Sequence, residues 1–141
     1  MGITMHVDIV SAEEAIYSGP AEMVVASSVD GDVGIMPRHS PMLTMLKPGE
    51  VRVIKVGGEA EFYYVSGGML EVLPHTVTVL ADTALRAESV DEAAAIRAKE
   101  EAEQALKDYK SSVDYAKAQA ELAEAVGQLH TIQRMRSKYG R

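Results

Sequence analysis

The stretch RAESVDEAAA, residues 86–95, divides the chain into two parts of different composition. Within it, Ser89 is followed three residues later by Glu92, which is the spacing of a capping box at the start of a helix. Residues 1–87 contain nine of the 11 glycines and all five prolines, whereas residues 88–141 contain 11 alanines and no proline. Glycine and proline mark turns, and alanine is the best helix former. The sequence therefore predicts short strands before this stretch and helices after it.

Before this stretch, turn residues separate short apolar segments. One hairpin with a two-residue turn is predicted around Gly57-Gly58, and a second hairpin around Pro74-His75. Residues 5–9 alternate between apolar and polar side chains, which indicates a strand with one buried face, and residues 23–29 form another strand candidate. Turn signals that recur at this spacing are typical of a small antiparallel sandwich or barrel.

After this stretch, the pattern predicts two helices. The first covers about residues 91–109, and the break at residues 110–112 places Ser111 or Ser112 as the cap of the second. The second helix can continue to Tyr139, where Gly140 suits its C-terminal end. We therefore predict an α+β chain with an N-terminal antiparallel β-sandwich, residues 1–87, and a C-terminal two-helix antiparallel hairpin, residues 88–141.

Small residues recur along one face of each predicted helix. They are Ala95, Ala98, Ala102 and Ala105 in the first helix and Ala116, Ala120, Ala123 and Gly127 in the second. Such stripes predict close antiparallel packing, but each methyl group buries little apolar surface. The second helix also carries a stripe of larger side chains, Leu122, Val126, Leu129, Ile132 and Met135. These need another surface, which is either the sandwich or a partner protein.

The chain lacks the motifs of the common enzyme classes. It contains no cysteine, and its four histidines do not have the spacing of a metal motif. A nucleophile elbow and a phosphate-binding loop are also missing from the sequence. We therefore predict no catalytic residue, no metal and no cofactor. The net charge of −7 argues against nucleic-acid binding, and apolar runs of at most four residues predict no transmembrane helix.

Two segments are candidates for partner binding. Two glycines and two prolines predict an irregular loop in residues 31–42, whose apolar Ile35, Met36 and Met42 either form a docking surface or pack beneath the sandwich. The candidate contact residues in this loop are Asp32, Met36, Pro37, Arg38, His39 and Ser40. The last eight residues contain four positive charges, Arg134, Arg136, Lys138 and Arg141. These cations either complement the helix dipole or contact an acidic protein surface.

Six short segments spread along the chain carry a family resemblance. They are HVDIVSAE (6–13), GIMPRHSP (34–41), LKPG (46–49), SGGMLEV (66–72), VTVLADTA (77–84) and VDYA (113–116). Through them the chain resembles, over its whole length, the epsilon subunits of the bacterial F-type ATP synthase. The resemblance implies an N-terminal β-sandwich and a C-terminal two-helix domain, in agreement with the composition.

The resemblance also implies a function. It implies a non-catalytic subunit at the foot of the rotating central stalk, which helps to couple proton flow to ATP synthesis. The implied partners are the gamma subunit, the ring of c subunits and, in an inhibitory state, the catalytic alpha and beta subunits. The loop matching residues 32–40 is implied to contact the c ring. The helices are implied to fold against the sandwich or to extend along gamma and restrain ATP hydrolysis. The implied location is the cytoplasmic face of the bacterial cell membrane, reached only through the complex.

Some members of that family bind ATP at an aliphatic-Asp-x-x-Arg-Ala motif that opens the first helix. The matching residues here are 90–95, with Asp91 in place and Ala94 at the arginine position. Arg97, three residues further on, is the one candidate to replace that arginine. We therefore expect ATP to bind weakly or not at all.

Two other function classes compete with this interpretation. A stand-alone small-molecule-binding β-sandwich with a helical interaction arm would need a pocket with converging polar groups. A small hydrolase would need a nucleophile and a base. The sequence contains no clear pattern for either, and co-purification with a membrane ATPase would separate both from the stalk interpretation.

Overall fold

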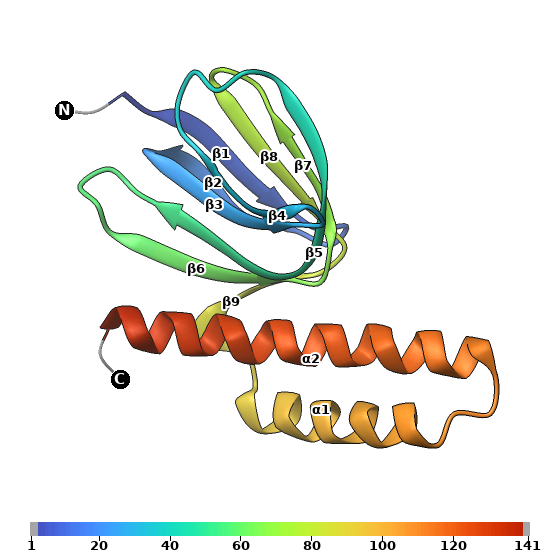
Figure 1. Ribbon diagram of the computed structural model, residues 1–141. Coiled ribbons are helices and arrows are strands. Elements are labelled where there is room, and N and C mark those ends of the chain that lie inside the picture. Colours follow the sequence, from blue (N-terminus) through green and yellow to red (C-terminus); the bar gives the residue numbers. More distant parts are fainter. Residues whose placement is uncertain (1–2, 140–141) are drawn as a thin grey trace.

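The computed structural model describes residues 3–139, except for the side chains of residues 138 and 139. The elements in this range are β1 (Met5–Val10), β2 (Ala15–Ala21), β3 (Met23–Ser28), β4 (Gly31–Ile35), β5 (Met42–Ile54), β6 (Ala60–Val65), β7 (Gly68–Val72), β8 (Thr76–Ala81), β9 (Ala84–Arg86), the 3-10 helix η1 (Ala87–Ser89), α1 (Glu92–Lys107) and α2 (Ser112–Tyr139). The strands form a sandwich, and the two helices form an antiparallel hairpin beneath it (Figure 1). The predicted α+β fold is confirmed.

The sandwich is one continuous hydrogen-bonded sheet that folds over on itself. Its strand order is β2-β1-β8-β7-β5-β3-β4, and β6 and β9 continue from β5. Residues 42–46 of β5 pair with β7, whereas residues 49–54 of the same strand pair with β6. The strand changes neighbours at Lys47-Pro48, where proline has no N–H to donate. One pair departs from the antiparallel prediction, because β1 and β8 are parallel.

The main hydrophobic core lies entirely inside the sandwich. All of its buried members come from residues 5–84; most are aliphatic, such as Val7, Ile9 and Leu70, and the largest is Tyr63. Each fully buried aliphatic side chain stabilises the fold by about 1.5–3 kcal/mol. No described helix residue belongs to this main core, so it packs without the hairpin, whereas Ala60 and Phe62 of β6 form a second, smaller cluster that Met135 of α2 partly covers.

The turn at Gly57-Gly58 is longer than the sequence predicted. The strands end at Ile54 and restart at Ala60, and the amide of Lys55 donates to the carbonyl of Glu59 over 2.7 Å. The turn therefore contains three residues, with φ values of 97° and 93° at Gly57 and Gly58. The positive φ angles explain the two glycines, although the two-residue turn was wrong.

Both helix starts are capped by side chains, one of them at a residue other than the predicted one. Ser89 lies in η1, and Asp91 caps α1 by accepting a hydrogen bond from the amide of Ala94 over 3.0 Å. The predicted Ser89 cap is therefore wrong, since the 3-10 turn delays the start of the α-helix by two residues. Ser111 accepts from the amide of Asp114 over 3.1 Å, which confirms the cap of α2. Gly140, the predicted end residue, lies outside the described residues.

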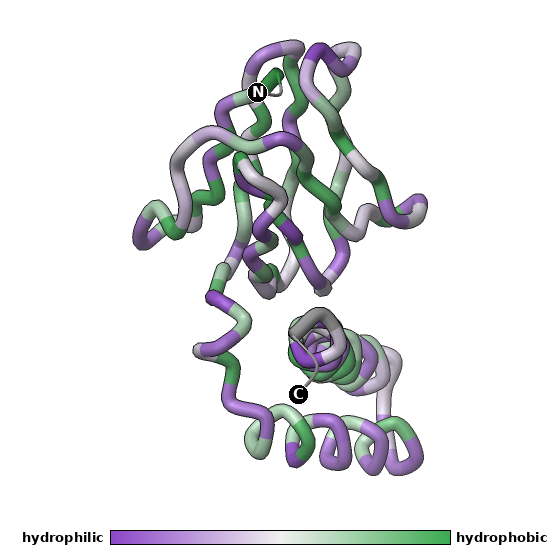
Figure 2. Tube along the Cα trace, turned by 90° about the vertical axis from the view of Figure 1, so that its left-hand side faces the viewer, coloured by the Kyte–Doolittle hydropathy of each residue, from purple (hydrophilic) through white to green (hydrophobic). Residues whose placement is uncertain are grey.

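The helix α2 lies between the sandwich and α1, with the β9–η1 connection running down one side (Figure 2). On α1, Ala95 and Ala102 are buried as predicted, whereas Ala98 and Ala105 are exposed. On α2, the predicted small residues Ala116, Ala120 and Ala123 are all exposed. The residues buried or half-buried on one side of α2 are Ala118, Leu122, Ala125, Leu129 and Ile132. This face mixes small and large side chains at steps of four and three, so the predicted separate alanine stripe was wrong.

Gly127 has a different role from the predicted one. A Cβ atom at this position would lie 3.0 Å from the carbonyl carbon and oxygen of Pro48. Gly127 therefore permits the close approach of α2 to the bend in β5, rather than contributing to the seam between the helices. Of the predicted large stripe, Ile132 is buried but Val126 is 44% exposed. Neither described helix combines the length and the apolarity needed to cross a bilayer.

Candidate functional site

The loop after β4 lies at the end of the sandwich that is remote from the helices (Figure 1). The amide of Arg38 donates to the carbonyl of Pro74 over 2.7 Å, which ties this loop to the β7–β8 turn. Arg38 has a φ of 68°, and Nδ1 of His39 lies 2.7 Å from the carbonyl oxygen of Ser40. These contacts hold the loop in one shape with its polar side chains at the surface.

The apolar residues of this region divide between the core and the surface. Ile35 is 1% exposed and belongs to the core, Met42 is half-buried, and Met36 is 60% exposed. Met36 and Pro37 also line a shallow hollow of about 390 Å³ with Ile3 and Glu22. Each of the two predictions for this loop is therefore correct for one residue. Ile35 packs beneath the sandwich, whereas Met36 is exposed and can form part of a docking surface.

Asp32 is separated from the other candidate loop residues. It lies in β4, opposite Ser27 of β3, so residues 31–35 are a strand and not the irregular loop that was predicted. A strand rises about 3.3 Å per residue, which places Asp32 roughly 13 Å from Met36. The candidate residues therefore occupy two places, Asp32 at one end of β4 and residues 36–40 beyond the other.

The outer face of β5, β7 and β8 is unusually apolar. Met45, Met69 and Leu80 are direct cross-strand neighbours, and they are 58%, 36% and 52% exposed. Leu43, two residues before Met45 on the same face of β5, is 64% exposed. The solvent face of an antiparallel sheet normally carries polar side chains. We call these four residues the apolar face, and its composition is that of a protein contact surface.

The sequence contains a signal for the apolar face. Leu43 and Met45 alternate with half-buried Met42 and buried Leu46, so both sides of this part of β5 are apolar. The same doubling occurs at Met69-Leu70. A strand with apolar residues on both faces indicates that both faces are covered.

Two arginines at the end of α2 are paired within the chain. Arg136 donates two hydrogen bonds to the carboxylate of Glu92 at the start of α1, over 2.9 and 2.6 Å. These bonds lower the pKa of Glu92. Arg134 lies 3.9 Å from the carboxylate of Glu50 on β5. The side chain of Lys138 and the whole of Arg141, which complete the predicted basic end, lie outside the described residues.

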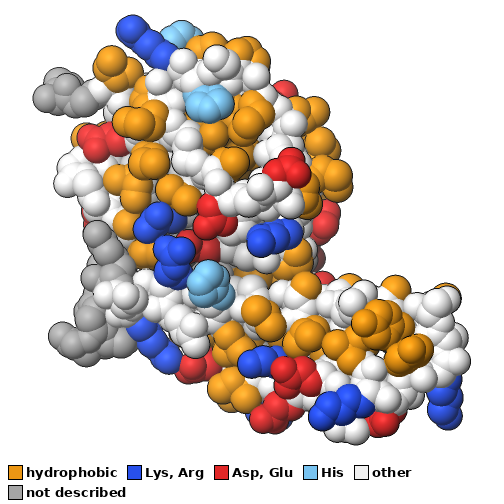
Figure 3. All heavy atoms as spheres, in the orientation of Figure 1, with side chains coloured by type: hydrophobic (Ala, Val, Ile, Leu, Met, Phe, Trp, Pro, Cys, Tyr) orange, Lys and Arg blue, Asp and Glu red, His pale blue; other side chains and the backbone are white. Residues whose placement is uncertain are grey.

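Polar atoms without partners gather where the sandwich meets α2. In the described part of the chain, the buried side-chain atoms that lack a hydrogen bond are Oε2 of Glu50, Nε of Arg52 and the hydroxyl of Tyr64. Glu50 and Arg52 lie on the same face of β5, and Tyr64 is opposite Glu50 on β6. Figure 3 shows charged and histidine side chains at this level of the molecule. Each unpaired buried group costs about 1–3 kcal/mol, so this contact surface is only moderately stable.

The first turn of α1 holds the residues that match the ATP motif. The Asp91 carboxylate is occupied by its helix-capping bond to Ala94, and Arg97 is exposed further along α1. The neighbouring Glu92 is held by Arg136 of α2. The start of α1 is therefore engaged in contacts within the chain.

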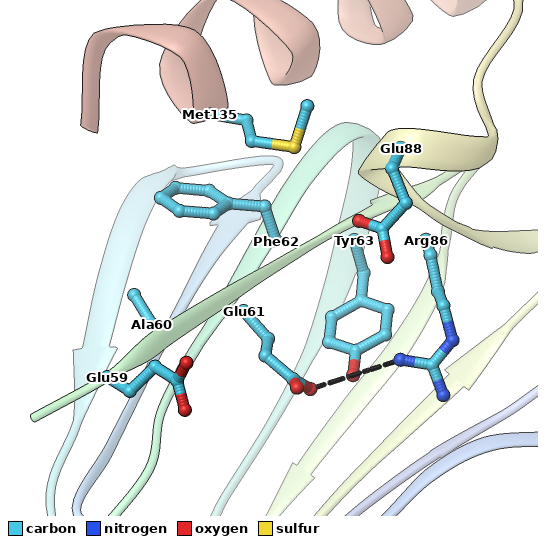
Figure 4. A pocket seen from close by; sticks show the side chains of 8 residues that line it. All are labelled: Glu59, Ala60, Glu61, Phe62, Tyr63, Arg86, Glu88 and Met135. Atoms are coloured by element: carbon cyan, nitrogen blue, oxygen red, sulfur yellow. Dashed lines mark hydrogen bonds and ion pairs between the residues drawn. The ribbon is translucent and has the colours of Figure 1, made fainter. Parts of the chain in front are cut away.

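A small pocket lies between the sandwich and the end of α2 (Figure 4). Its polar wall contains Glu61, which accepts hydrogen bonds from Tyr63 over 2.6 Å and from Lys55 over 3.2 Å and lies 4.0 Å from Arg86. These hydrogen bonds, that of Tyr63 first, lower the pKa of Glu61. Phe62 and Met135 form the apolar wall. Glu61 is thus held in a network of hydrogen bonds and ion pairs that fixes β6 to β5 and β9.

Models of one protein family match both parts of this chain. A family model described as "ATP synthase, Delta/Epsilon chain, beta-sandwich domain" matches residues 4–87. A second model, described as "ATP synthase, Delta/Epsilon chain, long alpha-helix domain", matches residues 88–133. The chain belongs to the ATP synthase delta/epsilon chain family. The family resemblance expected from the sequence is confirmed.

Close relatives of this delta/epsilon-family chain match it from end to end. It is 61% identical over 140 residues to the ATP synthase epsilon chain of Nitrosococcus oceani, covering 99% of this chain and all of that one. It is also 61% identical over 135 residues to the epsilon chain of Alkalilimnicola ehrlichii, covering 96% of each. These matches assign the chain to the epsilon branch of the family.

The fold of the delta/epsilon-family chain also matches solved structures. A chain of the Euglena gracilis mitochondrial ATP synthase, in a structure of OSCP, F1 and the c-ring, matches with a TM-score of 0.74 and 20% identity over 96% of this chain and 81% of that one. A chain of the central stalk and c-ring structure of the Tetrahymena thermophila mitochondrial ATP synthase matches with a TM-score of 0.63 and 13% identity, over 95% of this chain and 97% of that one. Both support the sandwich-plus-hairpin fold.

Proposed function

We propose that this chain is a non-catalytic central-stalk subunit of an F-type ATP synthase. It binds gamma and the c ring through its sandwich, helps to couple proton flow to ATP synthesis, and restrains ATP hydrolysis through its hairpin. Such a subunit is peripheral, held at the cytoplasmic face of the membrane by the complex. The observation that carries the proposal is the presence of two separate exposed surfaces on one rigid sandwich, the apolar face and the polar loop 36–40.

The apolar face is proposed as the gamma contact. Met45, Met69 and Leu80 form a row across three strands, so a partner that covers them buries a continuous apolar strip. Apolar burial at about 25 cal/mol per Å² is the main source of stability in a permanent subunit contact. A permanent contact fits a subunit that must rotate together with gamma.

The loop 36–40 is proposed as the c-ring contact, and Asp32, at the opposite end of β4 on the side of Glu50, is proposed as a separate contact point. Arg38 and His39 are polar side chains on a loop that is braced against Pro74, so they are positioned before binding. Pre-positioned polar groups lose little conformational entropy when they bind. The solved structures that share the fold are described as F1/c-ring and central stalk/c-ring assemblies, which supports a partner of this kind.

The hairpin is proposed as the inhibitory element. In its released state, the half-exposed residues Leu122, Val126 and Leu129 of α2 would contact gamma or the catalytic subunits. Arg134 and Arg136 would leave Glu50 and Glu92 and pair with carboxylates of alpha and beta, joined by Lys138. Both states then pair the same cations and bury much of the same apolar stripe, although Val126 is 44% exposed in the docked state, so they can lie within a few kcal/mol of each other.

Replacing Asp32 and His39 together by alanine is expected to weaken association with the membrane complex. Each lost hydrogen bond to a charged group costs about 1.5–3 kcal/mol, or roughly 10- to 150-fold in affinity. The measurement is the amount of c subunit and gamma that co-purifies with the tagged chain, together with ATP-driven proton pumping. The single variants then report which end of β4 contributes more.

Glu13→Ala is the control for these variants, because Glu13 is an exposed acid in the β1–β2 turn. It should leave co-purification and pumping unchanged. Wild-type coupling in the double variant would contradict the assignment of the c-ring contact. A wild-type chain that purifies from membranes without any ATP synthase subunit would contradict the proposed function itself.

ATP is expected not to bind at micromolar concentration. Ala94 offers no charge to a phosphate, and the Asp91 carboxylate already caps α1. Isothermal titration calorimetry should show no micromolar binding to the wild-type chain, whereas Ala94→Arg should increase the affinity by roughly 10- to 150-fold. If the wild-type chain bound ATP at micromolar concentration and Arg97→Ala abolished this, Arg97 would be the substituting residue and the expectation would be wrong.

A further inference from the structure

Glu50 is a carboxylate buried between the sandwich and α2. It is only 7% exposed, and its Oε2 atom has no hydrogen-bond partner among the residues that the structure describes. The closest ion-pair contact of its other oxygen is Nη1 of Arg134 at 3.9 Å, which is too long for a hydrogen bond. Covering Glu50 with α2 therefore removes water from this carboxylate and supplies only a weak partner in return.

The charged groups around Glu50 come from every element packed at this place. Arg134 and His130 face it from α2, Arg52 from β5 itself and Asp32 from β4. From β6, Tyr64 lies opposite Glu50, and its hydroxyl also lacks a hydrogen-bond partner within the described part of the chain. The cations favour the ionised carboxylate, whereas burial and Asp32 oppose it.

We propose that Glu50 is a pH-dependent latch for the hairpin. Protonation of its carboxyl group stabilises the hairpin in the docked position against β5 and β6, and deprotonation favours its release. The effect of this latch on ATP hydrolysis rests on the proposed function, but the docking equilibrium itself does not.

The direction follows from the protonation equilibrium of the docked state. Burial raises the pKa of Glu50 above its ordinary value of 4.5, and this outweighs the opposing effects of Arg134, Arg52 and His130. The docked state therefore binds the proton more tightly than the released state, in which Glu50 is in water. Docking is strongest below pH 4.5 and weakens as the pH rises through the higher pKa of the docked state.

Glu92 does not obscure this effect. Its pKa is lowered by the hydrogen bonds from Arg136, so its charge changes below the ordinary value of 4.5. The change in docking above that value is therefore assigned to Glu50. In the assembled enzyme, a rise in pH would favour the released hairpin and so increase the inhibition of hydrolysis.

The docking equilibrium can be measured on the full chain by fluorescence energy transfer. The sequence contains no cysteine, so single cysteines at Val56 and Val113 can carry the two dyes. These residues are 53% and 75% exposed, on the β5–β6 turn and at the tip of the hairpin. The docking constant is measured between about pH 5 and about pH 8. It should fall by up to about tenfold per pH unit over the interval in which Glu50 of the docked state loses its proton.

Glu50→Gln should keep the hairpin docked across this range and abolish the dependence on pH, because the amide is neutral and nearly the same size. Glu13→Gln and His130→Gln should retain the dependence. Arg134→Gln should lower the docking constant further at high pH, because it removes the cation nearest to the ionised carboxylate. The thermal unfolding of the sandwich in each variant shows that the fold is retained.

A wild-type chain with no dependence on pH, or a Glu50→Gln chain that keeps the wild-type slope, would overturn the latch. So would loss of the slope in His130→Gln alone. None of these measurements depends on ATP hydrolysis. A pH-dependent hairpin in an enzyme that hydrolyses ATP equally well without it would therefore refute the inhibitory function and leave the latch in place.

Discussion

Replacing Met69 by aspartate is expected to abolish binding of the chain to gamma. Met69 is at the centre of the apolar face, between Met45 and Leu80 on the neighbouring strands. An unpaired charge buried in an interface costs about 3–5 kcal/mol, which weakens affinity roughly 150- to 5,000-fold. Because the side chain is 36% exposed in the free chain, the aspartate remains hydrated there and the sandwich stays folded. The measurement is the dissociation constant for purified gamma.

Val56→Asp is the matched control for this variant. It introduces the same charge at a position that is 53% exposed in the β5–β6 turn, outside the apolar face. It should bind gamma as the wild-type chain does. Undiminished binding by the Met69→Asp chain would show that gamma contacts another part of the sandwich.

The main features of the fold could be predicted because they depend on local composition and on the local pattern of apolar residues. The concentration of glycine and proline before residue 88 and of alanine after it separates strands from helices. The alternation in residues 5–9 identifies β1 and its buried face. Strand pairing could not be predicted in this way. The strands β1 and β8 are about seventy residues apart, and their parallel pairing leaves no local pattern in the sequence.

The helix faces were the least predictable part of the fold. Ala116, Ala120 and Ala123 have helical spacing, and so does the mixed set that begins at Ala118 and Leu122. Spacing alone cannot choose between them, because the choice depends on the surface that α2 meets. That surface is the bend of β5 at Pro48, which requires Gly127. The burial of Glu50 follows from the same tertiary contact and had no signal in the sequence.

The candidate site was predicted unevenly for a similar reason. The loop at residues 36–40 could be found from composition, because Pro37 and Pro41 restrict the backbone there, whereas Gly31 and Gly34 of the predicted loop belong to β4. Asp32 was grouped with this loop because it is near in sequence and because the family resemblance implies a single contact loop at residues 32–40, but its place in β4 separates it. The apolar face combines β5, β7 and β8, so it could be assembled only once the strand order was known.

Deleting residues 111–141 is expected to raise the rate of ATP hydrolysis by the assembled enzyme. The deletion removes α2, with both arginines and the apolar stripe, and leaves the apolar face and loop 36–40 in place. The main core contains no described residue of the deleted segment, and only Met135 of the smaller cluster at β6 is lost, so the truncated chain should fold and assemble. Coupling energies of regulatory elements are typically 1–3 kcal/mol, so we expect an increase of roughly 5- to 150-fold. Neutralising Arg134, Arg136 and Lys138 should give part of this increase, and less of it at high salt.

In the proposed function, one chain both joins the stalk through its sandwich and restrains hydrolysis through its hairpin. The most direct test is the rate of ATP hydrolysis by one enzyme preparation that is rebuilt with either the intact or the truncated chain, at equal occupancy of the stalk. We expect equal assembly and faster hydrolysis with the truncated chain. Equal assembly with no increase in rate would contradict it, and would make the hairpin a structural brace rather than an inhibitor.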